Sequence, residues 1–116
     1  TRAFHIYNTP MDEKAEQLLK ESGILDNLNE ESIRDFFAET FAKFKDGELD
    51  AKTTAKIFDE LLYQHIYDME VKIKDSGLIS ALELASEIDE VDKNSPDYDI
   101  VMAPINDYLF SYEATA

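Results

Sequence analysis

The chain contains one long segment with neither glycine nor proline, DAKTTAKIFDELLYQHIYDMEVKIKDS, which runs from Asp50 to Ser76. At about 1.5 Å per residue, a helix of this length would reach about 40 Å, more than the width of a small domain. At helical spacing, one half of its circumference is largely apolar and holds Ile57, Phe58, Leu61, Leu62, His65, Ile66, Met69 and Ile73. We therefore predict one central helix over residues 50–76, against which the other segments pack.

Shorter helices are predicted around it, over residues 10–22, 29–46, 80–91 and 96–113. Each of the three glycines, Gly23, Gly47 and Gly77, directly follows a predicted helix, where a left-handed residue commonly ends it. Pro104 lies inside the last predicted helix. We expect it to kink or break that helix near residues 100–104, because proline lacks the N–H group that a helix interior needs.

Residues 1–8 differ from the rest, because apolar and polar side chains alternate there, with Phe4 and Ile6 on one side. This alternation predicts an extended arm, laid on the helices or paired with another copy of the chain. A chain of 116 residues with 44% hydrophobic residues is sufficient for one domain with one core. We therefore expect an all-α single domain: a bundle of about five helices around the central helix, with an extended N-terminal arm and a Pro-kinked C-terminal helix.

No site for a metal or a cofactor is recognisable in the sequence. The linker after residue 45 superficially resembles a calcium loop, because Asp46, Glu48 and Asp50 stand at the first, third and fifth ligand positions. It lacks the glycine required at the sixth position and the glutamate required at the twelfth, where Ala51 and Ile57 stand. A di-metal bundle would need Glu-x-x-His motifs, which neither histidine completes. We expect no metal and no cofactor.

Catalytic motifs are not recognisable either. There is no cysteine, no nucleophile elbow, no glycine-rich phosphate loop and no zinc-ligand spacing. His65 lies in the middle of the apolar half of the central helix, and we expect it to be a hydrogen-bonded core or boundary residue. The carboxylates are scattered, without an environment that would raise a pKa for acid–base catalysis. We expect a non-enzymatic protein.

The net charge of −15 is far more negative than solubility alone requires. Such a charge disfavours direct binding to nucleic acid or to anionic membranes, because both are polyanions, and it favours a basic protein partner. The acids are concentrated toward the C-terminus, since residues 75–116 hold ten acids and one base, Lys93. A nucleic-acid-binding protein or a basic toxin would match this charge.

The C-terminal acids form a candidate partner-binding surface. Glu83, Glu87 and Glu90 recur at four- and three-residue spacing and are expected on the outer face of the fourth helix. The series continues through the linker into the last helix as Asp89, Asp92, Asp97 and Asp99. Carboxylates one helical turn apart are about 5–6 Å from each other, near the spacing of phosphates along a nucleic-acid strand. We therefore expect this surface to fit a basic groove of a partner.

Two aromatic residues interrupt the polar half of the central helix. Tyr63 and Tyr67 are one turn apart, with Val71 a further turn along. Such a stripe either packs beneath the C-terminal segment of the same chain or forms an exposed patch that binds a partner. We favour the packing role and keep both tyrosines as candidate partner-binding residues.

Two functions from different classes remain open. The first is an acidic inhibitor or regulator that binds a basic surface of another macromolecule. It would be a nucleic-acid mimic of the kind that phages and mobile elements use in counter-defence, or an immunity protein or antitoxin. The second is a small assembly or adaptor protein, whose aromatic stripe or N-terminal strand holds a partner or a second copy as a homodimer. No segment is long and apolar enough to span a membrane and no secretion signal is recognisable, so we expect a cytoplasmic location.

Overall fold

Helices make up most of the described chain. The structure is a computed structural model that describes residues 10–115, and the predicted arm at residues 1–8 lies outside this range. Within residues 10–115 there is no β-strand, and the α-helices are α1 (Pro10–Ser22), α2 (Glu30–Lys45), α3 (Ala51–Asp59), α4 (Ser76–Ala85) and α5 (Pro96–Thr115). A short 3₁₀ helix, η2 (Ile24–Asp26), connects α1 to α2. The predicted all-α single domain is therefore confirmed.

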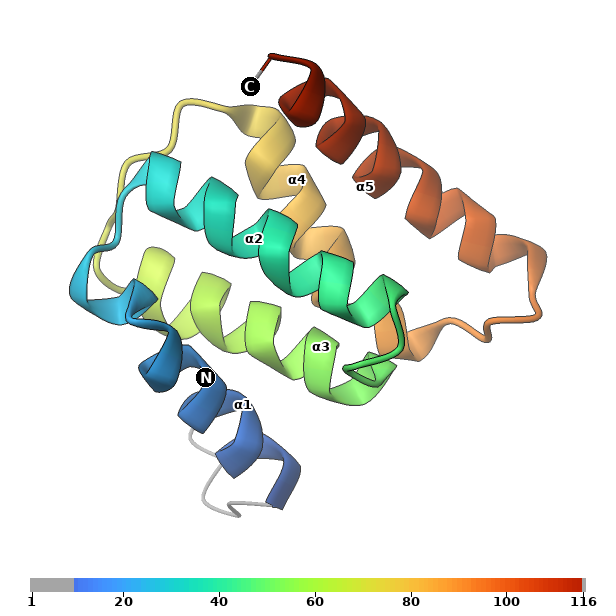
Figure 1. Ribbon diagram of the computed structural model, residues 1–116, viewed down its shortest axis with the longest axis horizontal. Coiled ribbons are helices and arrows are strands. Elements are labelled where there is room, and N and C mark those ends of the chain that lie inside the picture. Colours follow the sequence, from blue (N-terminus) through green and yellow to red (C-terminus); the bar gives the residue numbers. More distant parts are fainter. Residues whose placement is uncertain (1–9, 116) are drawn as a thin grey trace.

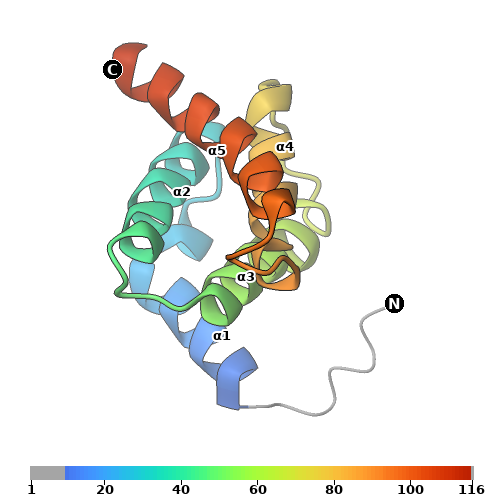
Figure 2. The same ribbon diagram turned by 90° about the vertical axis from the view of Figure 1, so that its right-hand side faces the viewer.

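The helices converge on α3. α1 packs along α3, α2 runs beside it, and α4 contacts both α3 and α5 (Figure 1). The view turned by 90° shows α1 at the bottom of the molecule and α5 toward the top, with α3 directly above α1 and with α2 and α4 on either side of α5 (Figure 2). One continuous core joins the layers and includes the fully buried residues Leu19, Phe37, Phe58, Leu82 and Ile105.

Local sequence signals account for the end of α1 and for both ends of α2. Asn29 caps α2, since its side chain accepts a hydrogen bond from Ser32 N at 2.9 Å while Ser32 Oγ accepts one from Asn29 N at 3.1 Å. This reciprocal pair satisfies two backbone donors that the helix itself leaves unpaired. Gly23 and Gly47 follow α1 and α2 with φ angles of 80° and 86°, the left-handed conformation predicted for them.

The prediction of a single helix over residues 50–76 is wrong. The α-helix α3 ends at Asp59 and continues as a π-helix, η3 (Glu60–Ile66), a class in which N–H groups bond five residues back. A turn follows, in which Glu70 adopts a left-handed φ of 52°, and residues 71–75 are not helical. The helical conformation therefore ends at Ile66, although the sequence predicts that the helix continues to residue 76.

Contacts with distant residues explain this interruption. Glu30, at the start of α2, accepts a hydrogen bond from the backbone N–H of Lys74 at 2.9 Å. Asp75 pairs with Arg34 at 3.4 Å and accepts a hydrogen bond from Tyr108 Oη at 3.0 Å. Since these partners come from α2 and α5, tertiary contacts override the helix propensity of the segment.

The prediction of a helix over residues 80–91 is also wrong. α4 begins earlier, at Ser76, and ends at Ala85, and a short 3₁₀ helix, η4 (Ile88–Glu90), follows. The reason is that Asp75 caps α4. Its carboxylate accepts hydrogen bonds from the N–H groups of the second and third helix residues, at 2.9 and 3.3 Å.

Gly77 consequently lies in the first turn of α4, so the prediction that it ends a helix is wrong. A glycine suits this position for a different reason, which is the close approach of Asp75 Oδ1 and of the Tyr108 ring. A Cβ atom at position 77 would lie 3.2 Å from Cδ1 of Tyr108, tighter than an ordinary van der Waals contact. The glycine therefore allows α5 to pack directly on the start of α4.

Pro104 does not break α5, which is helical without interruption from Pro96 to Thr115. The expected break near residues 100–104 is therefore absent, and the expected kink is not confirmed. Pro104 and Ile100 both lie on the exposed side of the helix. The carbonyl of Ile100, which would otherwise accept a hydrogen bond from residue 104, can therefore bond to water instead.

Candidate protein-binding groove

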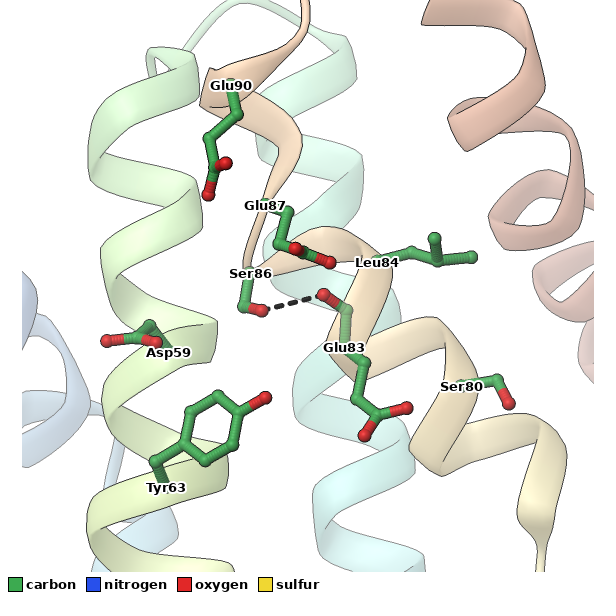
Figure 3. A pocket seen from close by; sticks show the side chains of 8 residues that line it. All are labelled: Asp59, Tyr63, Ser80, Glu83, Leu84, Ser86, Glu87 and Glu90. Atoms are coloured by element: carbon green, nitrogen blue, oxygen red, sulfur yellow. Dashed lines mark hydrogen bonds between the residues drawn. The ribbon is translucent and has the colours of Figure 1, made fainter. Parts of the chain in front are cut away.

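An open groove lies between α3, with its π-helical extension, and α4, with the turn that follows it (Figure 3). It has a volume of about 770 Å³ and is lined by Asp59, Tyr63, Ser80, Glu83, Leu84, Ser86, Glu87 and Glu90. Four of these residues are carboxylates, and none is lysine, arginine or histidine. We call this feature the α3–α4 groove, and its lining is strongly acidic.

The glutamates reach the groove from different elements. Glu83 lies in the last turn of α4, Glu87 in the turn that follows, and Glu90 at the end of η4. Ser86 Oγ donates a hydrogen bond to the carbonyl oxygen of Glu83 at 2.7 Å, where α4 ends (Figure 3). Ile88 is buried in the core, which leaves Glu87 and Glu90 exposed. A turn, rather than one helix face, therefore gathers the three glutamates.

Tyr63 lines the groove, and the ring of Tyr67 packs against the ring of Tyr63. The two ring centroids are 5.5 Å apart with an interplanar angle of 67°, an edge-to-face arrangement. The exposed fractions of Tyr63 and Tyr67 are 39% and 44%. The favoured prediction, that the C-terminal segment buries this stripe, is therefore wrong, and the rings are accessible to a partner.

The acidic and aromatic residues meet directly. Tyr67 Oη donates a hydrogen bond to Glu83 Oε2 at 3.4 Å. Partial burial, together with the negative charge and the hydrogen bond of Glu83, raises the pKa of Tyr67 above its ordinary value. Two candidate surfaces that are separate in the sequence therefore form one surface.

A smaller hollow of about 180 Å³ continues the groove along α3. It shares three residues with the groove, Asp59, Ser86 and Glu90. Asp89 also lines it and is thereby placed next to the groove. Lys56 also lines this hollow and contributes one positive charge.

The remaining predicted acids lie outside the groove. Asp92 is in the connection from η4 to α5, where its Oδ1 accepts a hydrogen bond from Asn94 N at 2.9 Å. Asp97 and Asp99 are exposed in the first turn of α5. None of the three lines either hollow. The structure thus gathers the acids of residues 83–90 and leaves the later ones on the connection and on α5.

Asp59 is a groove residue that the sequence analysis does not single out. It comes from α3, on the opposite side of the groove from the glutamates (Figure 3). It precedes Tyr63 by four residues, and this spacing is the signal that could have placed both on one helix face. Its position across the groove from the glutamates depends on the packing of α4 against α3, which the local sequence does not indicate.

Other candidate chemistry is not concentrated at one place. His65 is half-buried, and burial lowers its pKa although the charges of Glu16 and Asp68 act in the opposite direction. Among the described residues, no three His, Cys, Asp or Glu side chains gather where they could hold a metal ion. None of the helices within residues 10–115 combines the length and the apolar character that crossing a lipid bilayer requires.

Comparisons of the chain with protein-family models, with curated proteins and with solved structures find no match.

Proposed function

We propose that this is a non-enzymatic acidic protein that uses the α3–α4 groove to bind a basic surface of another protein and thereby inhibits or regulates it. The observation that carries the proposal is the composition of the groove, which combines four carboxylates with an exposed tyrosine and includes no basic residue. A concave surface lined by one sign of charge focuses its electric field on an approaching partner.

The tyrosine pair adds a second kind of contact for a basic partner. The faces of aromatic rings attract the cationic groups of arginine and lysine, and arginine also stacks on them. Tyr63 and Tyr67 present such rings beside Glu83. A basic side chain that enters the groove would pair with a carboxylate and contact a ring at the same time. Association by this route is fast and sensitive to salt.

In its sharpest form, the proposal is a nucleic-acid mimic, of the kind that phages and mobile elements use in counter-defence. Glu83, Glu87 and Glu90 follow one another along the groove, and Asp89 extends the acidic surface beyond it. A basic cleft that normally holds DNA or RNA would accept such a row of carboxylates. An immunity protein or antitoxin against a basic toxin uses the same electrostatics.

The alternative function is that of an assembly or adaptor protein. It is supported by the exposure of Tyr63 and Tyr67, since rigid exposed aromatic residues often dominate protein interfaces. In this case the tyrosines would contribute most of the binding energy, and the charge of the protein would mainly keep it soluble.

Capture of proteins from a cell extract on the immobilised protein distinguishes the two functions. For an acidic inhibitor, the captured proteins are basic, are released between low and moderate salt, and are displaced by added DNA if the protein is a mimic. Replacing Glu83, Glu87 and Glu90 by Gln abolishes capture, whereas replacing the exposed residues Glu31, Glu39 and Glu48 by Gln, which removes the same charge elsewhere, does not. The adaptor function would instead be established by capture that changes neither with salt nor in either triple variant. Such capture would be lost in the double variant Tyr63→Ala with Tyr67→Ala.

A further inference from the structure

The helix α5 has apolar residues on two opposite sides. Its inner side packs into the core through Met102, Ile105 and Leu109. Its exposed side carries Ile100, Ala103, Pro104, Asp107 and Phe110, which recur at three- and four-residue spacing. We call this second set the α5 outer face. A helix that is apolar around its circumference is usually covered on all sides.

The α5 outer face exposes the two most exposed large apolar side chains of the described residues. Phe110 is 74% exposed and Ile100 is 69% exposed. In a chain with 26 acids, this face carries one, Asp107. Asp97 and Asp99 flank this face only at the N-terminal end of α5, so the part around Phe110 combines apolar surface with few charges.

A hollow next to Phe110 provides room for an incoming side chain. It lies between α2 and α5 and has a volume of about 550 Å³. Its lining residues are Ala38, Ala42, Lys45, Asp46, Asn106, Asp107, Leu109 and Phe110. The small side chains Ala38 and Ala42 leave the hollow open on the α2 side, so an aromatic ring can enter beside Phe110.

The charges at this hollow have both signs, in contrast to those of the α3–α4 groove. Lys45 lies at the rim, where its Nζ donates a hydrogen bond to Asn106 Oδ1 at 3.1 Å. Asp46 and Asp107 line the same hollow. Lys45 and Asp107 are of opposite sign, so a two-fold axis that brings Lys45 of one copy opposite Asp107 of the other forms the same ion pair twice.

We infer that the α5 outer face and the adjoining hollow form the interface of a homodimer. Phe110 of each copy enters the hollow of the other, and Lys45 of each copy pairs with Asp107 of the other. In such an isologous contact every interaction occurs twice. The inference is independent of the proposed function, since the α3–α4 groove belongs to other helices and stays accessible in this dimer.

Salt distinguishes the two associations. Two copies of this protein repel each other through their net charge, so screening by salt strengthens the dimer. Binding of a basic partner in the α3–α4 groove, in contrast, weakens when the salt concentration is raised. Failure of one proposal therefore does not imply failure of the other.

Sedimentation velocity over a range of protein concentrations, at low and moderate salt, tests the dimer. We expect a concentration-dependent dimer that is stronger at moderate salt. Phe110→Ser and, separately, Ala42→Glu raise its dissociation constant about tenfold or more. Met69→Ser, which replaces a side chain that is 63% exposed outside this interface, leaves it unchanged. Circular dichroism shows that each variant is folded.

Cross-linking provides a readout that does not depend on the effect of these variants on folding. The chain has no cysteine, so Ala103→Cys and Met69→Cys each create a single reactive site. Ala103 is exposed on the α5 outer face, and a cysteine there leaves Phe110 in place. A short bismaleimide links two copies through position 103 and not through position 69. A wild-type protein that stays monomeric at every concentration and salt overturns the inference. So does a dimer that persists in both Phe110→Ser and Ala42→Glu, or cross-linking that is as efficient at position 69 as at position 103.

Discussion

Tyr67 donates a hydrogen bond of 3.4 Å from its phenol oxygen to Oε2 of Glu83, 16 residues later in the sequence. The bond joins the turn after η3 to α4. It links the aromatic stripe with the acidic residues, which the sequence presents as rival surfaces. Because Tyr63 packs on Tyr67 and lines the α3–α4 groove, a partner that contacts the carboxylates also meets the rings.

The first prediction concerns the ionisation of Tyr67. Glu83→Gln keeps the shape of the side chain but removes its negative charge, which disfavours the phenolate. We expect the pKa of Tyr67 to fall, while partial burial, the largest cause of the shift, still keeps it above the ordinary value. Carbon NMR of the tyrosine Cζ atoms measures the titration. Glu39→Gln, a charge change on α2, is the control, and an equal shift in both variants would contradict the Tyr67–Glu83 contact.

The second prediction concerns Asp75, which links the start of α4 to α2 and α5. Burial is the largest single influence on its pKa and raises it. The hydrogen bonds from Tyr108 and from the N–H groups of Leu78 and Gly77, with the charge of Arg34, outweigh burial and lower the pKa overall. The ionised carboxylate therefore stabilises the fold fully above the unfolded pKa of about 3.9, and this contribution is lost as the pH falls through the folded value.

Asp75→Asn tests this, because asparagine still caps a helix but carries no charge. We expect the free energy of unfolding at neutral pH to fall by about 1 kcal/mol, a modest value because the pair with Arg34 is partly exposed. Urea unfolding at a series of pH values measures it. The difference between wild type and Asp75→Asn shrinks once the pH falls below about 4. A difference that stays constant down to the acid transition would show that the charge of Asp75 has no role.

The third prediction concerns Pro104, which lies inside α5 on its exposed side. Pro104→Ala restores the N–H group that can bond to the carbonyl of Ile100. We expect the free energy of unfolding to rise by about 1–3 kcal/mol, the usual difference between the two residues in an exposed helix interior. Ala103→Pro is the matched control and is expected to destabilise the protein. A neutral or destabilising Pro104→Ala would mean that α5 is strained at this point for another reason.

The parts of the fold that the sequence predicts are those that depend on neighbouring residues. The start of α2 follows from Asn29, which forms a capping box with Ser32. The ends of α1 and α2 follow from Gly23 and Gly47, both with positive φ. In each case the hydrogen bonds or the backbone conformation involve residues within a few positions, so a local pattern is sufficient.

The interruption between η3 and α4 could not be predicted in this way. It depends on Glu30, Arg34 and Tyr108, which lie far from the segment in sequence and bond to Lys74 and Asp75. One local signal was available, since apolar and charged residues alternate from Val71 to Lys74, as in extended chain. The helical spacing of apolar residues over the longer segment 50–76 favours a helix instead, and the prediction follows that spacing.

The candidate site was predictable only in part for the same reason. Glu83, Glu87, Glu90 and the two tyrosines were each identified from composition and spacing. Their meeting in one groove depends on the interruption, which allows α4 to pack beside α3.

We propose that the acidic and aromatic residues form one binding surface for a basic partner. Titration of the isotope-labelled protein with a short arginine-rich peptide, followed by amide NMR shifts, tests this claim. We predict that the largest shifts, in residues 59–67 and 83–90, share one dissociation constant, weaken with salt, and disappear when Glu83, Glu87 and Glu90 are replaced by Gln. Shifts spread evenly over all acidic regions, or largest at Asp97 and Asp99, would contradict the claim.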